Sequence, residues 1–318
     1  MQRAVVAAQH ETRVDEALEG TRRGPRVEAG VGPHRVDGCR AEHERGERAA
    51  AIVVGEEADQ LPGCERRFRH GDSFARLMEP MNFDGIERVL VVTAHPDDVD
   101  FGWAGTVARL TDAGIEVTYC VCTDGDAGGA ETGVSRAEMG PKRREEQTEA
   151  AAVVGVHELH FLGYPDGRVE PSLDLRRDIT RVIRMARPDR VLMQSPERNW
   201  DRVYASHPDH LAVGEATIAA VYPDARNRWA HPELEAQGLQ PWSVPEVWLG
   251  AGAIDVTHYV DITDTFERKI QALLSHKSQL PDPDATREMV RAWTGFTATS
   301  AGLPEGRLAE SMRVIGTA

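Results

Sequence analysis

The feature that most constrains the fold is a short apolar run, Val89 to Val92, that turns directly into one histidine and three aspartates by residue 100. Such a run is typical of a strand buried on both faces, as in the centre of a parallel sheet. Pro96 blocks further pairing and favours an extended backbone at His95. We therefore expect this strand to present His95, Asp97 and Asp98 at its carboxyl end, where open α/β sheets bind their ligands.

Apolar strands and amphipathic helices alternate from Phe83 onward, which is the rhythm of a parallel α/β fold. The expected strands are 89–93, 116–122, 158–162, 190–194, 246–250 and 258–262, and the expected helices are 102–113, 141–154, 173–186, 210–221, 264–279 and 285–296. Right-handed crossovers would place these helices on both faces of the sheet. The predicted fold class is α/β, with a Rossmann-like, mostly parallel sheet flanked by helices.

Residues 1–80 differ in composition from the rest of the chain. Arg, Glu, Gly and Ala dominate there, and the apolar residues follow neither a 3.6-residue nor a 2.0-residue period. A segment of this kind buries too little apolar surface to fold by itself. We expect residues 1–80 to be a poorly structured extension and residues 81–318 to form the functional domain. Met81 or Met78 is interpreted as the natural start, and a genuine flexible tail is the alternative.

Charge and cysteine content narrow the function classes. The net charge of −15 argues against a nucleic acid or an anionic membrane as partner. The apolar run near the N-terminus is too short for a signal peptide, and no apolar run in the sequence approaches the ~18 residues of a membrane span. A cytoplasmic protein is therefore predicted. Four cysteines without a Cys-x-x-Cys pair do not indicate a disulfide scaffold, and Cys120 and Cys122 are expected in the core.

A three-point metal site is predicted from residues on separate elements. His95 and Asp98 lie on one loop, and His210 lies at the start of a later helix. Two imidazoles and one carboxylate suit Zn²⁺ and leave a position for water, although Fe²⁺ or another divalent metal could occupy the same ligands. Taken singly, each residue has a structural alternative, since an aspartate before a helix is commonly a cap.

Two neighbours of these ligands are predicted to act on the reacting groups. Asp97 lies beside the ligand Asp98 and is the candidate general base for a metal-activated water. His207 lies one helical turn before His210 and is expected to face the same cavity. There it could stabilise an oxyanion or donate a proton to a leaving amine.

These motifs resemble those of the PIG-L (LmbE-like) deacetylases, zinc hydrolases that remove the N-acetyl group from N-acetylglucosamine-type sugars. The resemblance covers about residues 86 to 280 and is carried by Ala94 to Asp98, Thr123 to Gly129, Arg143 with Glu146, Leu162 to Gly167, His207 to His210 and His276 to Gln279. It implies metal ligands at His95, Asp98 and His210, the base at Asp97 and an assisting histidine at His207. Arg143 and Asp166 are sugar-binding candidates by position, and Trp103 is a candidate for narrowing the pocket mouth.

The predicted function is therefore a zinc-dependent N-deacetylase acting on a small amino sugar. A dinucleotide-dependent oxidoreductase is disfavoured, because the carboxylates after the first strand would repel a pyrophosphate. An amidase that cleaves a thiol-sugar S-conjugate is the nearest alternative, and a non-catalytic metal- or sugar-binding module is the alternative from another class. The sequence leaves the oligomeric state open, a homo-oligomer included.

Overall fold

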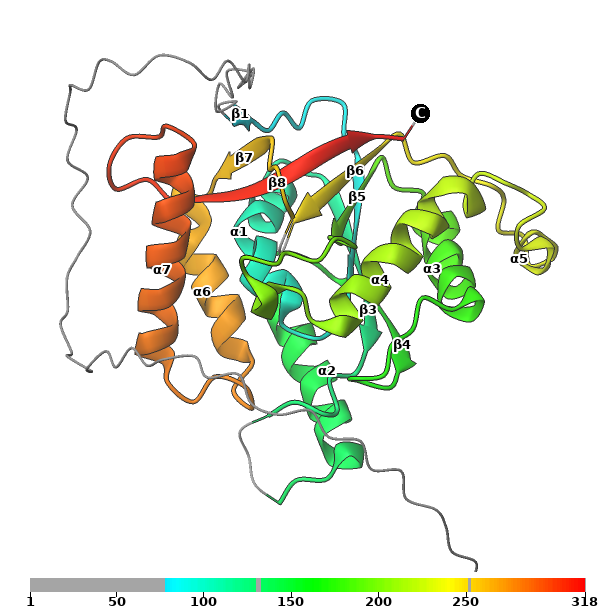
Figure 1. Cartoon of the computed structure of the whole chain (residues 1–318), viewed down its shortest axis with the longest axis horizontal. Helices are drawn as coiled ribbons and strands as arrows, with labels where there is room; N and C mark the ends of the chain where they lie inside the picture. Colours follow the sequence, from blue (N-terminus) through cyan, green and yellow to red (C-terminus); the bar gives the residue numbers. More distant parts are fainter. Residues whose placement is uncertain (1–77, 130–132, 251–252, 318) are drawn as a thin grey trace, which may run out of the picture. The chain divides into compact units, whose positions relative to one another are not determined.

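A computed structural model describes residues 78–129, 133–250 and 253–317. For Tyr204, within the second range, it describes the backbone but not the side chain. Within these residues, eight strands form one sheet in the order β1-β7-β8-β6-β5-β2-β3-β4 (Figure 1). The strands are β1 (Glu79–Pro80), β2 (Arg88–Thr93), β3 (Glu116–Thr123), β4 (Glu158–Tyr164), β5 (Arg190–Gln194), β6 (Glu246–Gly250), β7 (His258–Asp261) and β8 (Ala309–Gly316). Neighbouring strands from β6 to β4 pair in parallel, which confirms the predicted fold class.

Helices cover both faces of this sheet. They are α1 (Asp98–Asp112), α2 (Arg136–Val153), α3 (Leu173–Ala186), α4 (Pro208–Ala219), α5 (Pro232–Ala236), α6 (Phe266–Ser275) and α7 (Pro283–Ser300). Figure 1 shows α1, α6 and α7 on one side of the central strands and α3 and α4 on the other. The described residues also form three shorter helical turns, at Val203–Ala205, Ala220–Asp224 and Thr263–Thr265.

The core consists of two hydrophobic layers separated by the sheet. Side chains alternate along β2, so Val89 and Val91 pack with α1, α2 and α6, while Leu90 and Val92 pack with α3 and α4. This double burial is the reason that the strand reads as a continuous apolar run. Cys120 and Cys122 are buried and free, as expected. Cys39 and Cys64 lie outside the described residues.

Most helix boundaries differ from the predictions by a few residues, and two of the differences have a clear local reason. The helix predicted to open at Pro141 begins at Arg136, because Ser135 precedes it and the Glu138 carboxylate accepts the backbone N–H of Ser135 at 2.9 Å. Pro141 lies inside this helix. The first helix begins at Asp98, four residues before its predicted start, because the Asp97 carbonyl accepts the N–H groups of Asp100 and Phe101.

The C-terminal strand β8 was not predicted. It lies antiparallel between β6 and β7 and carries the buried Glu310. The Glu310 carboxylate accepts from Lys269 Nζ at 2.7 Å and from the hydroxyl of Thr106 at 2.6 Å. A charged residue in a buried strand interrupts the apolar pattern by which strands are predicted. The ion pair that makes its burial possible joins residues that are distant in the sequence, so it is known only from the structure.

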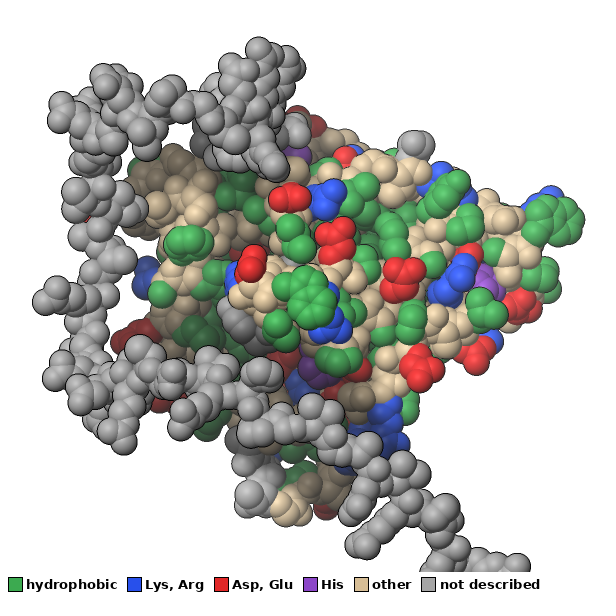
Figure 2. Space-filling model, in the orientation of Figure 1, with side chains coloured by type: hydrophobic (Ala, Val, Ile, Leu, Met, Phe, Trp, Pro, Cys, Tyr) green, Lys and Arg blue, Asp and Glu red, His purple; other side chains and the backbone are tan. Residues whose placement is uncertain are grey.

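The last residues of the predicted extension belong to the sheet. Residues 1–77 of the predicted extension lie outside the described residues, while Glu79 and Pro80 form the edge strand β1, which pairs in parallel with β7. No helix in the described part of the chain has the length and apolar character that a membrane span requires. Acidic, basic and hydrophobic side chains are interspersed on the face drawn in Figure 2.

Candidate metal centre and active site

Three segments meet at the carboxyl ends of the central strands. The loop from His95 to Asp98 follows β2, Asp166 follows β4, and the segment that carries His207 and His210 follows β5 and opens α4. Because β2 and β5 pair directly and in parallel, their carboxyl ends lie at the same edge of the sheet. Residues 115 positions apart in the chain therefore come into contact.

The three predicted metal ligands are brought together. His95 Nδ1 lies 3.2 Å from His210 Nε2 and 3.3 Å from Asp98 Oδ2, and His210 Nε2 lies 3.0 Å from Asp98 Oδ1. A tetrahedral site with bonds of about 2.0–2.1 Å has edges of about 3.3 Å between its donor atoms. The three separations are close to these edges, with His95 nearest to Oδ2 and His210 nearest to Oδ1 of the Asp98 carboxylate.

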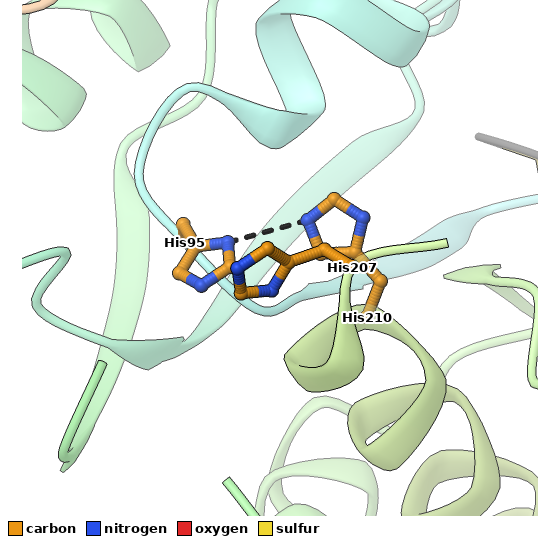
Figure 3. Close-up of side chains that lie close together, drawn as sticks. All are labelled: His95, His207 and His210. Atoms are coloured by element: carbon orange, nitrogen blue, oxygen red, sulfur yellow. Dashed lines mark hydrogen bonds between the residues drawn. The ribbon is translucent and has the colours of Figure 1, made fainter. Parts of the chain in front are cut away.

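The histidines form a second arrangement that contains the same two imidazoles. Figure 3 shows the rings of His95, His207 and His210 turned toward one another, with a dashed line joining His95 and His210. One nitrogen from each ring lies within 4.8 Å of the others. The ring centre of His207 is 4.9 Å from that of His95 and 5.4 Å from that of His210. His207 is thus placed either to lie beside a cation held by His95, Asp98 and His210 or to serve as the third ligand in place of Asp98.

Two buried carboxylates hold the other side of the His95 ring. Nε2 of His95 lies 3.1 Å from Asp166 Oδ1 and 3.2 Å from Asp209 Oδ2. Because ionised carboxylates only accept hydrogen bonds, they place the proton of a neutral His95 ring on Nε2, and in that form the Nδ1 lone pair faces Asp98 and His210. His95, Asp166 and Asp209 are also close enough together to hold a cation, but a proton donated by Nε2 accounts for these contacts.

The electrostatic field of the site is strongly negative. Burial alone would lower the pKa of His95, but the charge of Asp98 and hydrogen bonds to Asp166, Asp209 and Asp98 raise it to about 12. Burial acts against ionisation of Asp98, yet the neighbouring charges of His210 and His95 hold its pKa well below the usual range. Carboxylates that stabilise positive charge on an imidazole equally favour a divalent cation between the same groups.

Asp97 has an unusual backbone and a buried environment. It precedes α1 with φ at +88°, in the left-handed region that residues other than glycine rarely adopt. Its Oδ2 accepts from Arg143 Nη2 at 2.8 Å, and 17% of its side chain is exposed. Burial raises the pKa of Asp97 to about 6, with Arg143 opposing the shift and Asp98 adding to it. A carboxyl group with such a pKa can both accept and return a proton near neutrality.

His207 is the most exposed of the three histidines. Its Nδ1 accepts the backbone N–H of Asp209 at 3.2 Å and so caps α4. Burial and the charges of His95 and His210 lower the pKa of His207, which favours the neutral ring. Because Nδ1 is the acceptor, the neutral ring carries its proton on Nε2.

The three predicted substrate contacts fare differently. Trp103 is 1% exposed and lies in the core against the backbone of Gly250 on β6, so it cannot narrow a pocket mouth and that prediction is wrong. Its large apolar ring is stabilised by burial, which the sequence pattern alone did not indicate. Arg143 is buried and donates to Asp97, to the Pro96 carbonyl and to the Gly125 carbonyl. Asp166 is bound to His95, and the sugar-binding roles of Arg143 and Asp166 stay predictions.

Sequence reasoning missed a buried carboxylate that belongs to the site. Asp209 is 1% exposed and accepts the backbone N–H groups of Gly167 at 2.7 Å and Val169 at 3.3 Å, in addition to its contact with His95. Its position between two candidate histidines was the available signal. Asp100, to which the sequence analysis assigns no role, is fully buried and accepts hydrogen bonds from Gln147 and His276.

Comparison with known proteins agrees with this geometry. The family model described as PIG-L, GlcNAc-PI de-N-acetylase, matches residues 90–221, which include the predicted ligands. Diacetylchitobiose deacetylase of Thermococcus kodakarensis is 34% identical over 248 residues, which cover 76% of this chain and 86% of that protein. A probable N-acetyl-alpha-D-glucosaminyl L-malate deacetylase 2 of Bacillus cereus is 32% identical over 196 residues, which cover 60% of this chain and 83% of that protein.

A solved structure shares the fold as well as the sequence. N,N'-diacetylchitobiose deacetylase from Pyrococcus horikoshii, complexed with its inhibitor MPG, superposes with a TM-score of 0.67 at 31% sequence identity. The match covers 73% of this chain and 85% of that one.

Proposed function

The chain belongs to the PIG-L family of deacetylases, and from this premise we propose that it is a metal-dependent hydrolase that removes the N-acetyl group from an N-acetylglucosamine-type sugar. The observation that carries the proposal is the set of donor atoms on His95, Asp98 and His210, 3.0–3.3 Å apart, next in the chain to the partly exposed carboxylate of Asp97. Relatives named for chitobiose and for a glucosaminyl malate support an amino sugar as the substrate class.

We propose that His95, Asp98 and His210 hold the metal, with zinc as the ion that best suits two imidazoles and one carboxylate. When bound, such an ion supplies Lewis acidity and lowers the pKa of water in the site. Asp166 and Asp209 keep the His95 proton on Nε2, so that the nitrogen facing the metal keeps its lone pair.

Asp97 is the proposed general base. Its carboxylate accepts a proton from the water that attacks the acetyl carbonyl, and returns that proton to the sugar nitrogen as the C–N bond breaks. Arg143 stabilises the ionised form of Asp97 through the hydrogen bond to Oδ2. The products are acetate and the free amine, so one water is consumed for each bond cleaved.

His207 is the proposed oxyanion donor. Its Nδ1 is engaged by the Asp209 N–H, so the proton on Nε2 is available to the acetyl oxygen as negative charge develops there. This assignment makes His207 a hydrogen-bond donor in its neutral form, in agreement with the lowered pKa of the ring.

Metal analysis combined with amine release tests the proposal. The purified protein is analysed for zinc and iron and assayed with N,N'-diacetylchitobiose, N-acetylglucosaminyl malate and free N-acetylglucosamine. The proposal expects about one divalent ion per chain and release of acetate and a primary amine from at least one glycoside. Bound metal without release from any of them would instead favour an amidase or a non-catalytic binding module.

A further inference from the structure

The left-handed backbone of Asp97 is held by a residue that is not one of the proposed metal ligands. The N–H of Asp97 is accepted by Oε1 of Gln147, a fully buried residue of α2, at 2.8 Å. An L-residue at φ +88° persists only where surrounding groups determine its conformation. Gln147 is therefore a direct constraint on the direction in which the Asp97 side chain leaves the backbone.

The orientation of the Gln147 amide is itself set by a buried carboxylate. Its Nε2 donates to Asp100 Oδ2 at 2.9 Å, and His276 Nε2 donates to the same oxygen at 2.8 Å. An ionised carboxylate accepts hydrogen bonds and cannot donate them. The amide must therefore turn its nitrogen toward Asp100, which leaves its oxygen facing Asp97.

We propose that His276, Asp100 and Gln147 form a positioning chain that holds Asp97 in its working geometry. All three side chains are fully buried, so none of them reaches the substrate or the reacting atoms. These contacts link the residue after α6 to the first turn of α1 and then to α2. The inference rests on the function proposed for Asp97, and it assigns His276 a role that the three-ligand site does not include.

A donor-acceptor swap tests the chain. Gln147→Glu keeps an acceptor for the Asp97 N–H but places two carboxylates against each other, so kcat is expected to fall about 10- to 100-fold. Asp100→Asn removes the group that dictates the amide orientation and is expected to lower kcat in the same range. In the double variant the new amide donates to the new carboxylate, and neutral His276 can present its Nε2 lone pair, so much of the lost kcat is expected to return.

The readouts separate positioning from general destabilisation. KM, metal content and thermal midpoint are measured for each variant, together with hydrogen exchange of the Asp97 amide by NMR, which does not depend on activity. The matched control is Thr106→Val on the same helix α1, which removes a buried hydrogen bond of 2.6 Å to Glu310 without contact to Asp97. The control is expected to lower the thermal midpoint and to leave kcat within about twofold of the wild type.

A second pair of variants tests the far end of the chain. His276→Gln keeps an N–H donor for Asp100, whereas His276→Leu removes it, so only the leucine variant is expected to lose kcat and protection of the Asp97 amide. The proposal is overturned if Gln147→Glu keeps wild-type kcat. It is also overturned if kcat of the double variant does not exceed that of the less active single variant. If the wild-type protein binds metal but releases no amine, the proposed function is refuted instead. The hydrogen exchange of the Asp97 amide would still test the positioning chain.

Discussion

The two His-Pro-Asp tripeptides of this chain have the same sequence and opposite environments. In the first, His95 is buried and Asp97 keeps part of its carboxylate exposed. In the second, His207 is exposed and Asp209 is buried against three donors. The proposed ligand and the proposed base of the first tripeptide thus correspond to an exposed histidine, the proposed oxyanion donor, and to a buried aspartate that supports His95 in the second.

The start of the following helix explains the difference. Asp97 is the residue before α1, whereas His207 is the residue before α4, with Pro208 in its first turn. Helix α1 begins after the third residue of its tripeptide, whereas α4 begins after the first residue of its own, so the two helix starts differ by two residues. Asp209 therefore lies in the first turn of α4, where its side chain is buried. The same three residues acquire different chemistry because their register against a helix end differs.

The largest expected effect is loss of the metal. Asp98→Ala removes a donor that lies 3.0 Å from His210 and 3.3 Å from His95, so bound metal and activity should both be lost. His207→Ala removes a ring that is proposed not to be a ligand and should keep the metal. Metal content per chain, measured after dialysis, compares the two, and the opposite pattern would assign His207 as the ligand.

The same substitution in both tripeptides sharpens the comparison. Asp97→Asn removes the proposed base and should lower kcat about 10²- to 10⁴-fold, with metal content unchanged. The measurement is the rate of amine release at saturating substrate, with metal analysis of the same sample. Full activity in this variant would refute the proposed role of Asp97.

Asp209→Asn is expected to have a smaller effect of a different kind. Its buried carboxylate stabilises the Nε2 proton of His95, so the substitution should weaken metal affinity or activity about 10- to 100-fold. Added metal should restore part of the activity, which it should not do for Asp97→Asn. Titration with zinc in the presence of a competing chelator measures the difference, and equal responses of the two variants would contradict the assigned roles.

The smallest expected effect is a shift of the pH profile. Asp97 has a pKa raised to about 6, and the positive charge of Arg143 lowers it. Arg143→Met removes that charge, so the pKa of Asp97 should rise further and the acidic limb of kcat/KM should move to higher pH. The pH dependence of kcat/KM for both proteins measures the shift, and movement of this limb toward lower pH would contradict it.

The sequence predicted the fold best where periodicity decides it. One helix and two strands have the predicted bounds, namely Leu173–Ala186, Arg190–Gln194 and Glu246–Gly250. The strand β8 escaped prediction because its buried Glu310 is satisfied by Lys269 from another element. The start of α2 was misplaced because a serine cap outweighed the proline signal.

The sequence by itself determined which residue types stand at the ends of which strands, because the period of apolar residues and the position of Pro96 are local properties. The convergence of His95, Asp98 and His210 followed from parallel strands whose ends meet at one edge. Only the tertiary structure decided the partners of these residues. Gln147 and His276 lie 47 and 176 positions from Asp100, and no local pattern records contacts at such separations. Burial and hydrogen bonding across these distances distinguish the five aspartates of the site, which as residues are chemically identical. They are Asp97, Asp98, Asp100, Asp166 and Asp209.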